Sequence, residues 1–301
     1  MPFRVTDSAT NARLTSQIAT SRQRFAKVQE QLASGKRINR PSDDPVGAGD
    51  VLRLRTKQTE LAQFSRNVDV TRETLQVGDN VLDSYQQLLD DARALMTRAA
   101  TDPVVLEARV PIAIELEGII SRVQQLANTK SGDAYVFGGT RLDAPPYDAN
   151  GVPAATPTTE TTIQVEPEGT LIATGVTAES FLDDGTGTLI DALKTAATAI
   201  RGTGTWATDH ATILGTVDRL KGFSELSNQA RTKLGERLNH ADEISARLSQ
   251  YNLSIEESAQ RIETVDVAEA AIALKESDTA LNAILQAASQ FGRRSLLDFI
   301  G

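Results

Sequence analysis

Apolar side chains recur every seven residues between positions 54 and 96. The row comprises Leu54, Leu61, Val68, Leu75, Leu82, Leu89 and Met96. This spacing keeps one apolar seam facing a partner along a supercoiled pair of helices. Asp44 is suited to cap the helix, Pro45 to begin it, and Pro103 ends it. We therefore expect one helix of about 57 residues, roughly 85 Å long.

A second seam of the same period lies in the C-terminal half. Its members are Ile213, Leu220, Ser227, Leu234, Ala241, Leu248, Ile255 and Ile262, with Phe223, Ala230, Ile244, Tyr251 and Val265 as companions. It begins near Thr208 and predicts another helix of about 57 residues. Two seams of matched length, far apart in sequence, indicate an antiparallel pair.

Both ends of the chain carry shorter seams. The N-terminal one is Leu14, Ile18, Phe25, Val28 and Leu32; the C-terminal one is Leu274, Leu281, Ile284, Ala288 and Phe291. The interval from Ile262 to Leu274 is twelve residues, so the phase slips, and we place a break near Val265 and Asp266. The polar run over residues 34–41 separates the two N-terminal seams.

The middle of the chain has a different pattern. Residues 103–130 predict a helix that Pro111 should kink or divide. Strands are expected at 134–137, 162–165 and 171–173, and a short helix at 189–201. The fold class is therefore mainly α: a long antiparallel coiled-coil or helical-bundle rod formed by the N- and C-terminal segments, with a small β-rich outer domain inserted in the middle.

Three regions are expected to form domains. Residues 1–41 and 266–301 are terminal assembly helices, residues 42–133 and 189–265 are the helical rod, and residues 134–188 are the β-rich insert.

Charge and composition narrow the function. The chain of 301 residues has a net charge of −9, which argues against nucleic-acid binding. Residues 1–40 contain eight Lys or Arg and only two acidic residues, whereas residues 142–193 contain nine acidic residues and no basic one. No stretch is apolar enough for membrane insertion, and the first 20 residues lack the apolar core of a signal peptide.

Candidate chemistry is sparse. There is no cysteine, and aromatic residues are 4% of the chain. Glu236 and His240 are one helical turn apart but have no third ligand nearby in sequence, so a surface pair is favoured over a metal site. There is no nucleophile elbow and no complete phosphate loop. We expect no enzyme, no catalytic residue and no cofactor.

Several motifs carry a resemblance to the flagellin superfamily. The run LASGKRINRPSDDPVG at residues 32–47 resembles the N-terminal signature of that family, and the segments 135–140, 265–270 and 295–300 are similar to it as well. The variant RPSDDP at residues 40–45 is closer to the family's proteins at the hook–filament junction than to flagellin.

The resemblance implies a structural subunit of the bacterial flagellum. Such a subunit leaves the cell through the flagellar type III exporter, without a cleaved signal peptide, and is secreted to the extracellular flagellum. Its implied partners are hook-associated protein 1, flagellin, further copies of itself in a ring, and an export chaperone that engages roughly residues 270–301.

We expect the terminal seams to form the assembly interface, because short helices with narrow seams are marginal alone. Residues 1–40 and 267–301 would then be mobile in the monomer and order on assembly. A stable intramolecular hairpin is the alternative. The expected interface residues are Leu14, Ile18, Phe25, Val28, Leu32, Leu274, Leu281, Ile284, Phe291, Leu296, Leu297 and Phe299. Ser42, Asp43, Asp44 and Pro45 are expected to form a helix cap in a loop where subunits meet.

Two other functions stay open at this point. A flagellin-like subunit would form the filament itself. A cytoplasmic coiled-coil adaptor would bind partners by helix-in-groove contacts, which explains the heptads but not the terminal motifs.

Overall fold

The computed structural model describes residues 3–101, 106–154, 159–202 and 204–300, without the side chains of residues 3–8, 10, 11, 106 and 290–300. The chain forms two compact units. The first takes the chain up to Thr59 and again from Tyr251, and the second is Glu60–Gln250. The domain boundaries expected from the sequence remain a prediction.

Seven helices and four short strands make up the described chain. In order they are α1 (Phe3–Ser34), α2 (Pro45–Ala100), α3 (Leu106–Ala127), β1 (Lys130–Ser131), β2 (Ala134–Tyr135), β3 (Thr162–Gln164), β4 (Leu171–Ala173), α4 (Glu179–Leu182), α5 (Leu189–Arg201), α6 (Trp206–Glu263) and α7 (Val267–Ile300). The two long helices have 56 and 58 residues, close to the expected length. The expected break near Val265 is confirmed, because α6 ends before it and α7 begins after it.

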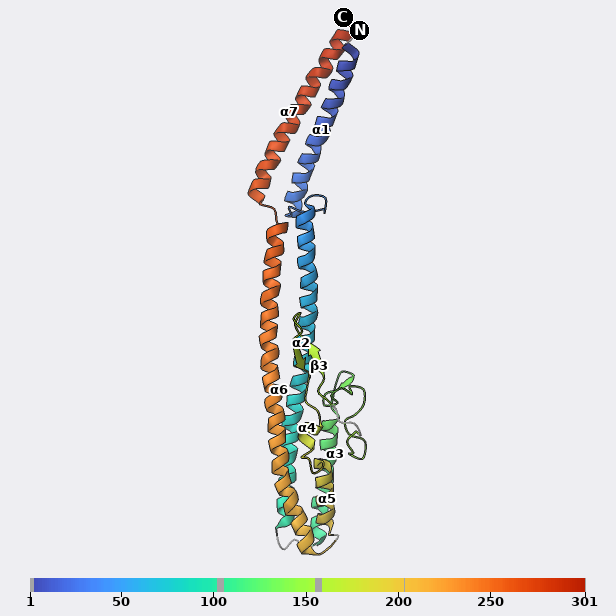
Figure 1. Ribbon diagram of the computed structural model, residues 1–301, viewed down its shortest axis with the longest axis vertical. Helices are drawn as coiled ribbons and strands as arrows, with labels where there is room; N and C mark the ends of the chain where they lie inside the picture. Colours follow the sequence, from blue (N-terminus) through green and yellow to red (C-terminus); the bar gives the residue numbers. More distant parts are fainter. Residues whose placement is uncertain (1–2, 102–105, 155–158, 203, 301) are drawn as a thin grey trace. The chain divides into compact units, whose positions relative to one another are not determined.

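In the second unit, α2 and α6 lie side by side and run antiparallel (Figure 1). Arg72 pairs with Asp242 across the two helices, whereas Arg231 bonds to Asp79 and Asp83. As the residue number rises along α2, the number of its partner on α6 falls, which confirms that the two helices are antiparallel. The described helices include none long and apolar enough to cross a membrane.

The predicted seams form the core of this unit. Buried seam residues are Leu61, Val68, Leu75, Leu82, Leu89 and Met96 on α2, and Ile213, Leu220, Ser227, Leu234, Ala241 and Leu248 on α6. At Gly78 an added Cβ would lie 3.2 Å from Leu234 Cδ1, so the glycine permits a close approach of α6. The expected seam companion Tyr251 is instead 52% exposed. A straight helix drifts by about 20° per heptad from a seven-residue repeat, which carries such a position off the seam.

Helices α3 and α5 pack against one another in the same unit. Pro111 lies inside α3 and does not divide it, contrary to one of the two expected outcomes. The expected cap Asp102 and first residue Pro103 lie outside the described residues. Helix α5 covers the range predicted for it.

The short strands form two antiparallel pairs, β1 with β2 and β3 with β4. Strand β1 precedes the insert, whose strands β2, β3 and β4 lie at the three expected positions. The buried aromatic side chains of the insert, Phe137 and Phe181, belong to the same hydrophobic core as the helices. Tyr85 of α2 packs edge-on against Phe181 and donates its hydroxyl hydrogen to the Phe181 carbonyl oxygen at 3.0 Å. The insert is therefore held to the long helices by packing.

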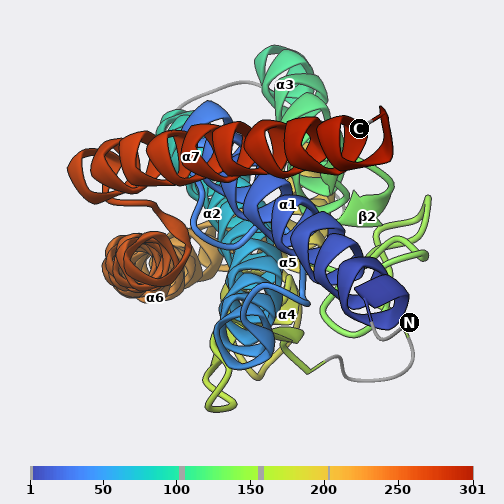
Figure 2. The ribbon, with the colours of Figure 1, turned by 90° about the horizontal axis from the view of Figure 1, so that it is seen from above.

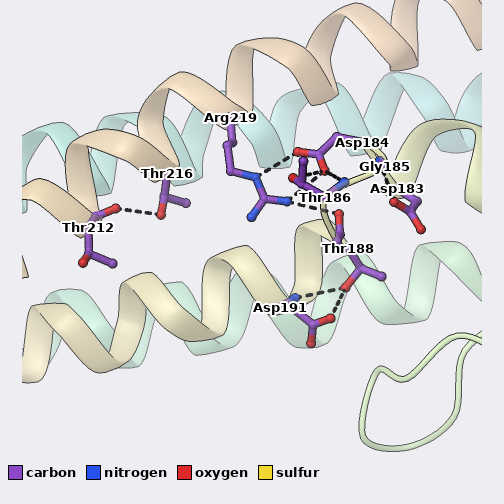
Figure 3. A network of polar contacts seen from close by, with 10 residues as sticks. Asp183, Asp184, Gly185, Thr186, Thr188, Asp191, Thr212, Thr216 and Arg219 are labelled. Carbon is purple, nitrogen blue, oxygen red and sulfur yellow. Dashed lines mark hydrogen bonds and ion pairs between the residues drawn. The ribbon is translucent and has the colours of Figure 1, made fainter.

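A polar network also holds the insert to α6 (Figure 3). The Arg219 guanidinium donates to both carboxylate oxygens of Asp184, at 2.8 and 3.0 Å, and to the Gly187 carbonyl oxygen at 3.1 Å. These bonds hold the pKa of Asp184 well below its usual range. The turn leads into α5, where the Thr188 hydroxyl accepts the Asp191 N–H as a helix cap.

Candidate assembly site

The terminal helices α1 and α7 pair within the first unit. They run antiparallel, and Figure 2 shows them inclined to one another. The structure thus forms a hairpin within one chain. Whether this hairpin persists in the isolated molecule or orders only on assembly stays a prediction.

The expected interface residues on these helices are only partly covered by their own chain. Leu14, Ile18, Phe25, Val28 and Leu32 on α1, and Leu274, Leu281 and Ile284 on α7, are all half-buried. The side chains of Phe291, Leu296, Leu297 and Phe299 lie outside those that the structure describes. Two helices cover only part of an apolar face, so these seams retain surface for additional helices.

The coverage differs sharply from that of the second unit. There the seam residues from Val68 to Met96 on α2 are between 0 and 3% exposed, because α6 and further elements surround them. Helix α7 also has apolar side chains away from α1: Val267 is 63% exposed, Ile272 63% and Leu285 37%. The pairing with α1 therefore leaves these three apolar side chains on α7 in solvent.

An open groove of about 850 Å³ runs between α1 and α7. Its small side chains include Ser21, Ser277, Ala273 and Ala280. Other lining residues are Ser16, Gln17, Thr20, Arg24, Lys27, Val28, Gln31, Glu276 and Ile284.

The loop between α1 and α2 provides the predicted cap. The Asp44 carboxylate accepts the Gly47 N–H at 2.9 Å, and Pro45 is the first residue of α2. A side chain at Gly47 would displace the cap, since an added Cβ would lie 2.5 Å from Asp44 Oδ2 and 2.7 Å from Ile38 Cδ1. The bond from Gly47 and the bond from Arg37 lower the pKa of Asp44.

Asp43 holds the loop itself. Its carboxylate accepts the backbone N–H of Arg40 at 3.0 Å and of Asn39 at 3.3 Å, and it pairs with Lys27 of α1 at 3.1 Å. The Lys27 contact is the main reason that the pKa of Asp43 is lowered. Ser42 is exposed. The expected helix cap is therefore present, whereas a contact of this loop with other subunits stays a prediction.

The two breaks in the helices are bonded to each other. The Arg37 N–H donates to the Glu263 carbonyl oxygen at 2.6 Å, and the Val265 N–H donates to the Gly35 carbonyl oxygen at 3.1 Å. Gly35 has a φ of +70°, which favours glycine. We call these contacts, between residues 35–37 and 262–265, the joint.

Charged side chains reinforce the joint. The Glu263 carboxylate forms an ion pair with Lys36 Nζ at 2.7 Å. Its two oxygens also accept hydrogen bonds from the Arg55 guanidinium, at 2.8 and 3.0 Å. The Arg37 guanidinium donates to the Ile262 carbonyl oxygen at 2.9 Å. Burial raises the pKa of Glu263, but the bonds from Lys36 and Arg55 outweigh it and lower the pKa. Sequence reasoning missed this acid, because nothing local links residue 263 to residue 36.

The chain is similar to known flagellar proteins in sequence and in fold. Residues 6–141 match the family model of the bacterial flagellin N-terminal helical region. Flagellar hook-associated protein 3 of Salmonella typhimurium is 27% identical over 132 residues, which are 44% of this chain and 42% of that protein. Flagellin of Listeria monocytogenes is 32% identical over 105 residues, 35% of this chain and 37% of that protein. The matched segments thus span about two fifths of the length of these relatives.

A solved structure shares the fold. A Vibrio parahaemolyticus protein described as a flagellar hook-associated protein superposes with a TM-score of 0.68, covering 74% of this chain and 100% of that chain at 19% identity. The predicted fold class is confirmed. The resemblance to the flagellin superfamily, and within it to hook-associated protein 3, is confirmed as well.

Proposed function

We propose that this relative of flagellar hook-associated protein 3 is a structural subunit at the junction between the flagellar hook and the filament. It would adapt hook-associated protein 1 to flagellin through packing of its terminal helices. The role is structural, without catalysis. Export by the flagellar type III route, with a chaperone at the C-terminal region, and a final place on the extracellular flagellum belong to the same proposal.

The half-covered seams of α1 and α7 carry the proposal. Leu14, Ile18 and Phe25 on α1, and Leu281 and Ile284 on α7, all remain half-buried within the single chain. In a ring of subunits, terminal helices from adjacent copies would cover the rest of each seam. Because each side chain is already half-buried, completing its burial contributes about half of the roughly 1.5–3 kcal/mol of full burial, so several seam residues together can drive association.

A deletion strain tests the role directly. We expect a strain lacking this chain to keep its hooks, lose its filaments and release flagellin as monomer into the medium. Expression of the full chain from a plasmid should restore filaments, and a labelled antibody should mark a short zone between hook and filament. Filaments of normal length in the deletion strain would contradict the proposal.

A flagellin-like subunit of the filament is the second candidate. It is favoured by the higher identity to the Listeria monocytogenes flagellin, 32% against 27% for hook-associated protein 3. Purified chain added to filament seeds separates the two, since a filament subunit extends the seeds into long polymers. Antibody label along whole filaments would likewise favour this candidate.

A further inference from the structure

A pocket of about 370 Å³ lies between the last two turns of α5 and the first two turns of α6, within the second unit. Its lining residues are Thr195, Thr198, Ala199, Gly204, Thr208, Asp209 and Thr212. In Figure 3 the Thr212 side chain points from α6 towards α5. The described lining residues include one acid and no base, so none of them neutralises the Asp209 carboxylate.

Asp209 is buried without a partner for its charge. The residue is only 5% exposed, and its side chain makes no hydrogen bond or ion pair with any residue that the structure describes. It lies in the first turn of α6, where the helix dipole compensates a carboxylate only in part, with about half a charge. Buried charges in proteins are paired or bind a metal ion, so this carboxylate calls for a cation.

The hydroxyl groups around Asp209 can act only as acceptors towards the pocket. A threonine hydroxyl has one hydrogen to donate, and in each of these residues a helix carbonyl oxygen of the same chain accepts it. The Thr195 and Thr198 hydroxyls donate to the carbonyl oxygens four residues earlier, both at 2.8 Å. The Thr208 and Thr212 hydroxyls donate to Thr205 and Thr208, at 2.8 and 3.0 Å. The pocket therefore presents oxygen lone pairs from both helices.

Two further features favour a cation in this pocket. A Cβ at Gly204 would lie 3.0 Å from the Thr208 hydroxyl oxygen and 3.8 Å from Asp209 Oδ1, so the absence of a side chain leaves space beside both oxygens. Thr198 and Ala199 belong to the last turn of α5, and the negative end of that helix dipole attracts positive charge.

We infer that this pocket binds a calcium ion, held by the Asp209 carboxylate, by threonine hydroxyl oxygens of α5 and α6, and by water. Calcium accepts about six to eight oxygen ligands in a flexible arrangement, and water completes the set where the protein supplies few. The ion ties the end of α5 to the start of α6. The site lies in the second unit, so it depends neither on the terminal helices nor on the proposed role in assembly.

The set of ligands indicates weak binding. The described residues contain no group of three acidic, histidine or cysteine side chains that could hold a metal ion. A single carboxylate in an open pocket corresponds to a dissociation constant of about 10⁻⁴–10⁻³ M for calcium. Magnesium demands near-ideal octahedral geometry, which hydroxyls fixed on two helices do not provide, so calcium should bind more tightly.

Terbium luminescence tests the site, because Trp206 is the only tryptophan in the chain. It lies three residues before Asp209 on α6, and side chains at that spacing are about 5–6 Å apart at Cβ. Tb³⁺ replaces Ca²⁺ at oxygen sites and emits when a nearby excited tryptophan transfers its energy. We expect emission from the full chain after excitation of tryptophan. Millimolar calcium chloride should displace the terbium, whereas potassium chloride at the same ionic strength should not.

Matched variants locate the ion. D209N keeps the size of the side chain but removes its charge, and it should raise the terbium dissociation constant at least about tenfold. The control is D218N, an exposed acid on the same helix that pairs with Lys221 outside the pocket. T195V/T198V keeps the carboxylate and should weaken binding about threefold, because it removes two oxygen ligands. T232V, whose hydroxyl bonds to the Asn228 carbonyl oxygen outside the pocket, should bind as the wild type does.

Thermal unfolding provides a readout without terbium. Calcium at about ten times its dissociation constant should raise the unfolding midpoint, followed by Trp206 fluorescence, by roughly 2–5 °C in the wild type and in D218N. The midpoint of D209N should not respond, and circular dichroism at low temperature checks that each variant is folded. Unchanged terbium emission in D209N, or equal calcium shifts in D209N and the wild type, overturns the site. Displacement of terbium by magnesium chloride as effective as that by calcium chloride overturns the choice of calcium.

Discussion

Leu75 and Leu281 are leucines in two seams of the same kind, but they differ in what covers them. Leu75 on α2 is 0% exposed and lies in the core of the second unit, whereas Leu281 on α7 is half-buried. Replacing each by alanine therefore compares a finished seam with one that we propose to be finished by neighbouring copies.

The expected costs follow from that difference. L75A removes buried atoms and leaves a cavity, which lowers the free energy of unfolding by about 2–5 kcal/mol. L281A loses only about half of the transfer free energy and leaves no enclosed cavity, so we expect about 1 kcal/mol in the monomer. In the assembly the same leucine should be worth the full amount, and L281A should raise the critical concentration tenfold or more, at about 1.4 kcal/mol per factor of ten.

Urea unfolding distinguishes the two units. Trp206 is the only tryptophan and lies in the second unit, where Arg109 stacks 3.6 Å from its ring centroid. Its fluorescence should therefore report L75A strongly and L281A by less than about 0.5 kcal/mol, while circular dichroism follows both units. The reasoning is refuted if L281A destabilises the monomer as much as L75A does, because the terminal seam would then already be complete.

Three further predictions concern single contacts. Y85F should lower the free energy of unfolding by about 1–3 kcal/mol in urea titrations, because it leaves the buried Phe181 carbonyl oxygen without its donor. E263Q should weaken the joint by about 1 kcal/mol by losing the charge that Lys36 and Arg55 share, and faster amide exchange near residues 35–37 should report it. Since the folded-state pKa of Glu263 is lowered, its stabilisation is present above the ordinary glutamate pKa and is lost as the pH falls towards the folded-state pKa. Acid titration of the wild type should show this loss, E263Q should lack that contribution, and identical curves would contradict it.

Periodicity predicted the long helices well, because their stability depends on one repeating contact. A row such as Leu61, Leu82 and Met96 reveals both the helix and its buried face without knowledge of the partner. The cap at Asp44 was equally accessible, since capping bonds connect residues three apart. The same logic located the break at Val265 from the phase slip alone.

Contacts between distant segments were not accessible in this way. Sequence spacing does not indicate that Glu263 meets Lys36 and Arg55, or that Tyr85 meets Phe181 of the insert. Such pairs depend on how the helices return along one another, and no local propensity encodes that. For the same reason the sequence indicated apolar seams on the terminal segments but not the groove between α1 and α7.

The joint and the half-covered seam depend on each other. A two-helix hairpin with a narrow seam could slide by one turn, about 5.4 Å, at small cost, and its charges would then lie at a different height. The bonds of Gly35 and Arg37 to Val265 and Glu263 prevent such a slide at one end of the hairpin. Each copy therefore presents its half-buried seam residues at the same level along the hairpin. Loss of the joint should consequently impair assembly even where every seam residue is intact, since neighbours would meet out of register.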